Sequence, residues 1–392
     1  MSTLADRLAG KRVIICAGAG GVGKTTVSAT VALGLAAGGR RVAVVTIDPA
    51  RRLAEALGLD RLGNEPRLVD PGLFSASGLQ MGGELWAMML DAKRTFDDLI
   101  ARLAPDVQTR DEILANPIYR HISGAVAGSQ EYTAIAKLFE LEHESDFDVI
   151  VLDTPPSRNA LDFLDAPERL TGFLESRALT AFLAPTRYTT RIVGVAFAAL
   201  RRVTGVGLLE DLSTFFELLS GLVGGFRERA SDVRGLLTDP ATAFLVVTSP
   251  ERAAIDEAIF FAAELDRKGM HRCGLIVNRV HPLELDERDT AVTTARLAPA
   301  LGARLAGEVA RTHADVQLLA RRDAAAVERL RGALHDADPI SLTDRTATCT
   351  ISAAWLISTA SCSAGATTDN NFLDLQAPRR RTTDACYVNL RM

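Results

Sequence analysis

A glycine-rich loop near the amino end of the chain holds the residue types best suited to chemistry. Residues 18–25 read GAGGVGKT, which satisfies the spacing G-x-x-x-x-G-K-[ST], and we call them the phosphate loop. Glycines lack a Cβ atom, so consecutive backbone amides can turn towards a phosphate group, and the lysine offsets its charge. The loop lies between a strand-like and a helix-like run, which predicts binding of a nucleotide polyphosphate tail. The expected binding residues are Gly18, Gly20, Gly21, Val22, Gly23, Lys24, Thr25 and Thr26.

Lys24 and two aspartates extend this chemistry to catalysis and metal binding. Lys24 is expected to neutralise β- and γ-phosphate charge, and the Thr25 hydroxyl to bind Mg²⁺. Asp153 follows an apolar strand-like run, where a carboxylate can hold Mg²⁺ through water. Asp48 follows another such run, at the edge of the sheet where open α/β folds bind ligands. A helix cap is the alternative role for each aspartate, but the nearby phosphate loop favours the site.

The elements that must hold these residues alternate between strands and helices. Five apolar runs predict buried strands: residues 13–17, 42–47, 149–152, 244–248 and 274–277. Residues 25–37 and 51–57 predict helices, whereas residues 84–90 fit either a strand or the start of a helix. The expected fold class is therefore α/β, a P-loop NTPase with a doubly wound, mostly parallel sheet and an inserted helical subdomain.

Two later segments differ in residue pattern from this sheet-forming part. Residues 161–234 show long helical periodicity, and we place a helical subdomain at about 157–235. It is either a layer packed on the sheet or a subdomain whose apolar groove binds a hydrophobic partner segment. One ATPase domain is expected at 1–340, followed by a disordered or frameshifted tail at 341–392, rich in Ser and Thr at first.

Composition limits the class of protein. The 392 residues are 47% hydrophobic, 24% charged and 5% aromatic, with a formal net charge of −5, which is typical of a soluble globular chain without a nucleic-acid-binding surface. The five cysteines include no Cys-x-x-Cys pair, and the amino end lacks the apolar core of a signal peptide. No stretch reaches the roughly 18–20 uncharged apolar residues of a membrane span. We expect a cytoplasmic protein with no nucleic-acid partner.

With these motifs in order, the chain resembles the ArsA-like ATPases. That family includes arsenite-pump ATPases, tail-anchored-protein targeting ATPases and an actinobacterial anion-transporting branch. The resemblance covers about residues 11–340. It rests on GAGGVGKTT at 18–26, TIDPARRL at 46–53, NPIYRHISGAVAGSQEY at 116–132, LDTPPSRNALDFLDAPERL at 152–170, VVTSPE at 246–251 and VNRVHP at 277–282.

The resemblance implies a role for each matching position. Asp48 corresponds to the catalytic residue that orients the attacking water, and Asp153, Thr154 and Pro155 to the segment that senses the γ-phosphate and Mg²⁺. Asn278 corresponds to the residue that reads adenine, so ATP is expected rather than GTP. The implied activity is Mg²⁺-dependent hydrolysis of ATP to ADP and phosphate. Family members work as dimers whose nucleotide state opens and closes the helical subdomain.

Ala19 departs from the family pattern, which has a lysine at this position in G-K-G-G-V-G-K. That lysine reaches the phosphates of the opposite subunit, and fingers of this kind raise rates about 10³–10⁵-fold. We therefore expect ATP binding with slow hydrolysis unless a partner subunit contributes. The chain would form a homodimer, or a heterodimer with a paralogous ATPase that retains the lysine. The alternative is a non-hydrolysing, nucleotide-dependent regulatory subunit of such a heteromer.

Other differences between this sequence and the branches of the family limit the function that the resemblance implies. The cysteines that define arsenite sensing or a bridging zinc have no equivalents, and Cys16 and Cys273 are expected in the core. A membrane protein or hydrophobic client is a further expected partner. A DNA partition ATPase and an electron-transfer iron protein of the same fold are disfavoured by the net charge and by the missing cluster ligands. Residues after about 339 are interpreted as out-of-frame, since a shifted frame of residues 347–353 can encode D-V-H-D-L-G.

Overall fold

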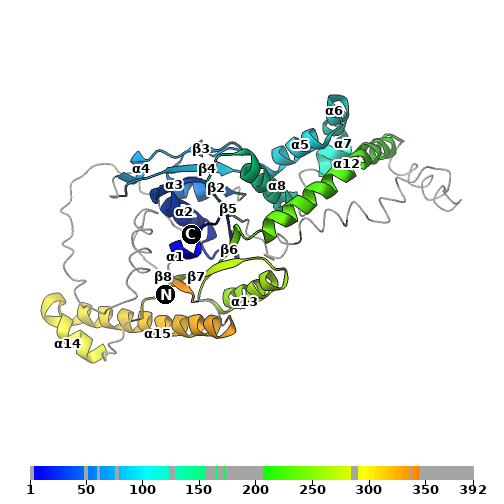
Figure 1. Cartoon of the computed structure of the whole chain (residues 1–392). Helices are drawn as coiled ribbons and strands as arrows, with labels where there is room; N and C mark the ends of the chain where they lie inside the picture. Colours follow the sequence, from blue (N-terminus) through cyan, green and yellow to red (C-terminus); the bar gives the residue numbers. More distant parts are fainter. Residues whose placement is uncertain are drawn as a thin grey trace, which may run out of the picture.

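An eight-stranded sheet forms the centre of the fold in the computed structural model (Figure 1). The structure describes residues 4–47, 52–59, 62–75, 79–122, 129–154, 165, 172, 206–283, 290–334 and 338–343. The strands are β1 (Val13–Ala17), β2 (Arg41–Thr46), β3 (Arg67–Leu68), β4 (Glu84–Met89), β5 (Val149–Asp153), β6 (Thr242–Thr248), β7 (Arg272–Val280) and β8 (Ile340–Thr343). Their order across the sheet is β3-β4-β2-β5-β1-β6-β7-β8, and every described pairing is parallel except β3–β4.

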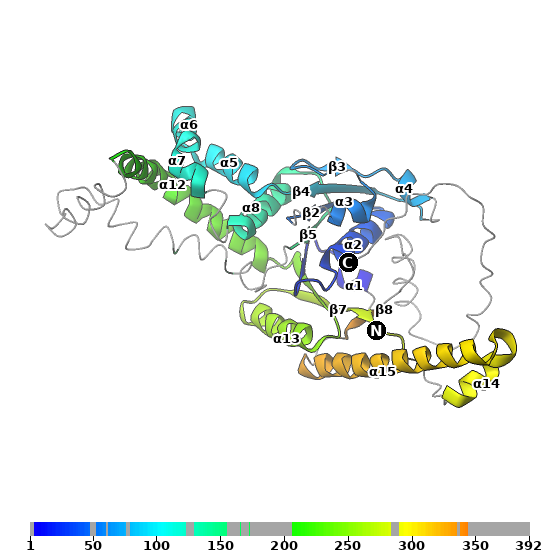
Figure 2. The ribbon, with the colours of Figure 1, turned by 180° about the vertical axis from the view of Figure 1, so that it is seen from behind.

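Helices connect and cover these strands (Figure 2). The described helices are α1 (Leu4–Arg7), α2 (Lys24–Ala37), α3 (Arg52–Leu57), α4 (Gly72–Ser75), α5 (Ala92–Leu103), α6 (Val107–Ala115), α7 (Pro117–Ile122), α8 (Ser129–Glu144), α12 (Val206–Thr238), α13 (Arg252–Arg267), α14 (Thr290–Leu301) and α15 (Ala303–Ala333).

Alternating side chains of the strands build two cores on opposite faces of the sheet. On one face, Ile14 and Val44 pack with residues of α2 and α3. On the other face, Ile15 and Val45 pack with residues of α8, α12 and α13. Strands that are apolar on both faces must be covered on both faces, so the continuous apolar runs specify a doubly wound sheet. This confirms the predicted fold class.

A group of helices projects beyond one side of the sheet. Both views show α5, α6, α7 and the first half of α12 there (Figures 1 and 2). Phe96 of α5 stacks on Phe226 of α12 at 6.1 Å, and Tyr119 of α7 lies 6.4 Å from Phe215 of α12. Helices α5–α8 therefore belong to the helical layer, although the sequence analysis placed it only at 157–235. Before residue 206, most of that predicted subdomain lies outside the described residues.

The structure assigns one segment that the sequence left open and extends the sheet to Thr343. The segment at 84–90, which the sequence left open, is strand β4. Strand β8 pairs with β7, so residues 341–343 belong to the sheet rather than to the predicted tail. Residues 344–392 lie outside the described part of the chain. Within the described part, none of the helices combines the length and the apolar character that crossing a membrane requires.

Candidate functional site

The phosphate loop joins β1 to α2 at the carboxyl edge of the sheet, with β5 and β6 on either side of β1. A Cβ atom on Gly18 would lie 1.9 Å from the carbonyl oxygen of Val247 on β6. A Cβ atom on Gly23 would lie 2.3 Å from Nδ2 of Asn278 on β7. Gly21 has open space around it but a φ of 79°, which residues with a Cβ rarely adopt. Glycine is thus required at Gly18 by the close approach of β6 and favoured at Gly21 and Gly23 by their positive φ angles.

The loop leads into a helix end that has no side-chain cap. Gly23 is the N-cap residue of α2, has a left-handed conformation and lacks any side-chain hydrogen bond to the first amides. The first amides of a helix have no intrahelical acceptors and attract anions. Thr26 is half-buried in this first turn, and Val22 is buried just before it. The predicted residues of the loop therefore surround one anion-attracting helix end.

Lys24 folds back over the loop that precedes it. Its Nζ donates hydrogen bonds to the carbonyl oxygens of Gly18 and Ala19, both at 2.9 Å. The side chain is only 6% exposed. A buried ammonium group needs such acceptors, because unpaired charge in the interior is costly. The loop thus carries a fixed positive charge beside its amides, as phosphate binding requires.

Three hydroxyl groups surround Asp153 at the end of β5. Thr25 and Thr46 donate to Asp153 Oδ2 at 2.8 and 2.9 Å, and Ser28 lies 3.3 Å from Oδ1. The strand register explains this meeting, because Asp153 is level with Cys16 on β1 and with Thr46 on β2. The structure thereby brings together Thr25 and Asp153, the two residues expected to bind metal.

Burial governs the charge of Asp153. It raises the pKa of this carboxyl group to about 6, although hydrogen bonds from Thr25 and Thr46 and the positive charge of Lys24 act in the opposite direction. A nearby divalent cation would favour the ionised form of such a group. A hydroxyl and a carboxylate are the hard oxygen ligands that Mg²⁺ prefers, so these side chains fit that metal.

The residue after Asp153 ties β5 to β1. The Thr154 hydroxyl donates to the carbonyl oxygen of Cys16 at 2.9 Å, and the backbone N–H of Thr154 lies 3.3 Å from the same oxygen. Asp48 and Pro155, which the sequence analysis placed beside this segment, lie outside the described residues. The catalytic role of Asp48 therefore stays a prediction.

Asn278 reaches the phosphate loop from β7. Its Nδ2 donates to the carbonyl oxygen of Val22 at 2.9 Å, next to the close approach at Gly23. The following residue, Arg279, has a φ of 61°, which costs a residue with a Cβ atom about 1 kcal/mol or more. The structure therefore brings the expected base-reading residue to the edge of the loop, at the end of a strained strand.

Sequence reasoning missed three polar residues of this site. Ser28 and Thr46 hydrogen-bond to Asp153, and only the pairing of the strands and the packing of α2 reveal this. Glu257 of α13 has a buried Oε1 atom without a hydrogen-bond partner among the described residues. Burial raises the pKa of Glu257, and the charge of Lys24 opposes this rise, so the two side chains interact electrostatically. Nothing in the spacing of residues along the chain distinguishes Glu257 from other helical glutamates.

The cysteines of the described part are structural. Cys16 is fully buried in β1, and Cys273 is half-buried in β7. Burial raises the pKa of Cys16 to about 12 and that of Cys273 to about 11, so both thiols stay protonated at neutral pH. No group of three His, Cys, Asp or Glu residues in the described ranges could hold a metal ion. Both cysteines therefore behave as the core residues that the sequence predicts.

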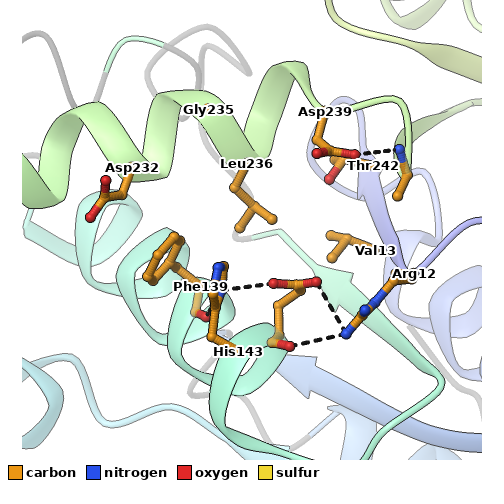
Figure 3. A pocket seen from close by; sticks show the side chains of 11 residues that line it. Arg12, Val13, Phe139, His143, Asp232, Gly235, Leu236, Asp239 and Thr242 are labelled. Atoms are coloured by element: carbon orange, nitrogen blue, oxygen red, sulfur yellow. Dashed lines mark hydrogen bonds and ion pairs between the residues drawn. The ribbon is translucent and has the colours of Figure 1, made fainter.

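A cavity of about 460 Å³ lies at the opposite, amino edge of the sheet (Figure 3). Arg12 and Val13 line it at the start of β1, and Thr242 lines it at the start of β6. None of the residues predicted for nucleotide binding is among its lining residues. It is separate from the phosphate loop, which lies beyond the other end of β1.

Comparison with known proteins agrees with the geometry of the phosphate loop. A profile of the family described as anion-transporting ATPase (ArsA ATPase) matches residues 11–299. A putative arsenical pump-driving ATPase of Aquifex aeolicus is 26% identical over 71% of this chain and 65% of its own length. The ATPase GET3 of Malassezia globosa is 27% identical over 68% of this chain and 72% of its own length.

A third relative is an uncharacterised protein of Streptomyces coelicolor, 29% identical over 69% of this chain and 63% of its own length. The match thus spans less than two thirds of two of these relatives. The region that the family profile matches contains the phosphate loop, the end of β5 and the end of β7.

Proposed function

This chain belongs to the anion-transporting ATPase family, and on that premise we propose that it is a Mg²⁺-dependent, ATP-binding and ATP-hydrolysing switch protein that dimerises when ATP binds. The observation that carries the proposal is the phosphate loop, where the close approach of β6 requires glycine at Gly18 and positive φ angles favour it at Gly21 and Gly23. A loop built this way, before an uncapped helix end, is suited to a polyphosphate.

Each side chain of the site has one part in this proposal. Lys24 moves from the carbonyl oxygens of the loop to the β- and γ-phosphates and offsets their charge. The amides of the loop and of the first turn of α2 bind the phosphate oxygens. Asn278 recognises adenine, and Asp48 orients the attacking water, as the family resemblance implies. Positioning of this kind supplies most of the catalysis in phosphoryl transfer.

Thr25 and Asp153 are the residues that would hold Mg²⁺. Their contact at 2.8 Å supports this, since the ionised carboxylate and the hydroxyl oxygen already lie together. When bound, Mg²⁺ supplies positive charge that stabilises the charge developing on the phosphate oxygens. Ser28 and Thr46 keep the carboxylate of Asp153 in place by their own hydrogen bonds.

Ala19 sets the expected rate and the expected partner. Since no lysine stands at this position, hydrolysis by the isolated chain should be slow, and a paralogous subunit with the lysine would complete the site. The same residue favours the second candidate function, a non-hydrolysing regulatory subunit of such a heteromer. A cytoplasmic location and a hydrophobic client remain parts of the proposal that need separate tests.

Titration calorimetry with MgATP and measurement of ATP turnover test the proposal. We expect the wild-type chain to bind MgATP and the Lys24→Ala variant to bind about 30-fold or more weakly, because charged hydrogen bonds are lost. Asp48→Asn should keep ATP affinity but lose turnover. Lys93→Ala, on the exposed surface of α5, is the matched control and should bind like wild type.

The outcomes separate the candidates. No binding of MgATP by the wild-type chain would refute both functions. Appreciable turnover by the chain alone would remove the regulatory-subunit alternative, whereas turnover that appears only with a lysine-bearing paralogue would support a heteromer. Unchanged turnover in Asp48→Asn would remove Asp48 from the mechanism.

A further inference from the structure

A buried carboxylate on α15 holds the segment that follows β7. Asp323 Oδ2 accepts a hydrogen bond from the backbone N–H of His281 at 3.1 Å and lies 2.7 Å from the ring Nδ1 of the same residue. The other oxygen, Oδ1, accepts from the guanidinium of Arg322 at 3.1 and 3.3 Å. The side chain of Asp323 is 0% exposed, and both views show α15 running beside β7 and β8 (Figures 1 and 2).

The partners of Asp323 keep it ionised. Burial raises its pKa and is the largest single influence, but the hydrogen bonds from His281 and Arg322 outweigh it and lower the pKa overall. Hydrogen bonds to an ionised acceptor are stronger than those to a neutral one. Gln317, on the same helix, adds a weaker tie by donating to the carbonyl oxygen of Pro282 at 3.4 Å. Helix α15 therefore fixes the chain directly after β7.

Asn278 and Arg279 lie between the phosphate loop and the segment that Asp323 holds. Asn278 is bound to the carbonyl oxygen of Val22, and Arg279 next to it has a φ of 61°. Arg279 is the only non-glycine residue with positive φ in the ranges that the structure describes. The pairing of β7 with β8 also shifts register between Val277 and Val280. A strained conformation of this kind persists where the surroundings hold it on both sides.

We infer that Asp323 is a positioning residue for recognition of the nucleotide base. By holding His281, it maintains the left-handed turn at Arg279 and keeps Asn278 beside the phosphate loop. The inference rests on the proposed function, in which Asn278 reads adenine. It makes base selectivity depend on a residue that lies 42 positions beyond His281 in the sequence.

Calorimetry with three magnesium-bound ligands tests the inference: ATP, GTP and inorganic tripolyphosphate, which has no base. Asp323→Ala should weaken ATP binding about tenfold and leave GTP and tripolyphosphate within about twofold of wild type. Asp323→Asn keeps one acceptor oxygen for the His281 N–H, so its loss of ATP affinity should be smaller. Asn278→Ala should show the same loss of ATP affinity as Asp323→Ala. The double variant should bind ATP within about twofold of the affinity of Asn278→Ala.

Asp256→Asn is the matched control, because Asp256 of α13 is an exposed carboxylate that pairs with Arg329 of the same helix α15. The Asp256→Asn variant should bind ATP, GTP and tripolyphosphate with wild-type affinity. The inference is overturned if Asp323→Ala keeps wild-type selectivity, loses tripolyphosphate as strongly as ATP, or adds its full effect to that of Asn278→Ala. A wild-type chain that binds ATP and GTP equally well would overturn the inference and leave nucleotide binding standing. A wild-type chain that binds none of the three ligands would overturn the proposed function as well.

Discussion

The hydroxyl of Thr25, the second residue of α2, donates to Asp153 Oδ2 at the end of β5 over 2.8 Å. These residues are 128 positions apart in the sequence and meet because β5 lies directly beside β1. The contact joins the first turn of α2 to the end of β5. The pKa of Asp153 therefore depends on its neighbours Thr25, Thr46 and Lys24 as well as on its burial.

Without divalent cations, the stability of the protein should fall as pH rises from about 4 to about 6. Burial raises the pKa of Asp153 to about 6 from the usual 3.8, so the folded chain binds this proton more tightly than the unfolded chain. The free energy of unfolding should therefore decrease across this window, by about 3 kcal/mol for a shift of about two pH units. Urea unfolding in EDTA at several pH values measures this.

Asp153→Asn is the control for this pH dependence. The amide does not titrate, so the variant should lack this contribution and gain stability relative to wild type at neutral pH. Parallel pH profiles of the two proteins would show that Asp153 titrates with an ordinary pKa in the folded chain.

Alanine at two glycines of the phosphate loop should have unequal effects. At Gly18, the added Cβ would meet the Val247 carbonyl oxygen at 1.9 Å, so β1 and β6 must move, and we expect a loss of about 3 kcal/mol or more. At Gly21, no atom lies within 4 Å and only the positive φ opposes alanine, for a loss of about 1–2 kcal/mol. Thermal unfolding of the two variants compares them. Equal losses would mean that the close approach at Gly18 is relieved at little cost.

Two buried threonines offer a test of the hydroxyl contacts around Asp153. Thr46→Val removes a hydrogen bond to a buried carboxylate and should lower the free energy of unfolding by about 1–3 kcal/mol at neutral pH. Thr242→Val replaces a buried hydroxyl that has no hydrogen-bond partner in the described structure, so it should be neutral or stabilising. Denaturant unfolding measures both. The argument fails if Thr242→Val is the more damaging change.

Ala19→Lys should raise the ATP turnover of the isolated chain. The substitution supplies the cation that the family pattern has at this position, and such groups contribute about 10³-fold or more to the rate. Ala19→Gln is the uncharged control and should stay at the wild-type rate. Equal rates in all three proteins would exclude the missing lysine as the reason for slow hydrolysis.

The sequence predicted the centre of the sheet because its strands are continuous apolar runs bounded by recognisable motifs, as at residues 13–17 and 149–152. It left residues 84–90 open, because a run this short fits a strand or a helix until its neighbours are known. It also missed α5–α8 as partners of α12, since periodicity reveals an apolar face but not what covers it.

The site divides in the same way. Gly18, Lys24, Thr25 and Asp153 could be predicted as candidates because the phosphate loop and a strand-terminal carboxylate are local patterns. Thr46 and Asp323 could not, because their contacts arise from strand register and from a hydrogen bond across 42 residues. Contacts between elements that are distant in the sequence produce no recognisable pattern of residue spacing.

Lys24 donates hydrogen bonds to two carbonyl oxygens of the phosphate loop. These bonds affect which anions can bind to Lys24. Any incoming anion exchanges two existing 2.9 Å hydrogen bonds for new ones, so its binding strength is the difference between the two sets. A group with a single modest charge, such as a carboxylate or a sulfate ester, gains little from this exchange. A chain of linked phosphates gains more, because it reaches the ammonium and the helix amides at once. We therefore expect the loop to bind linked phosphates more tightly than smaller anions that share only part of that chemistry.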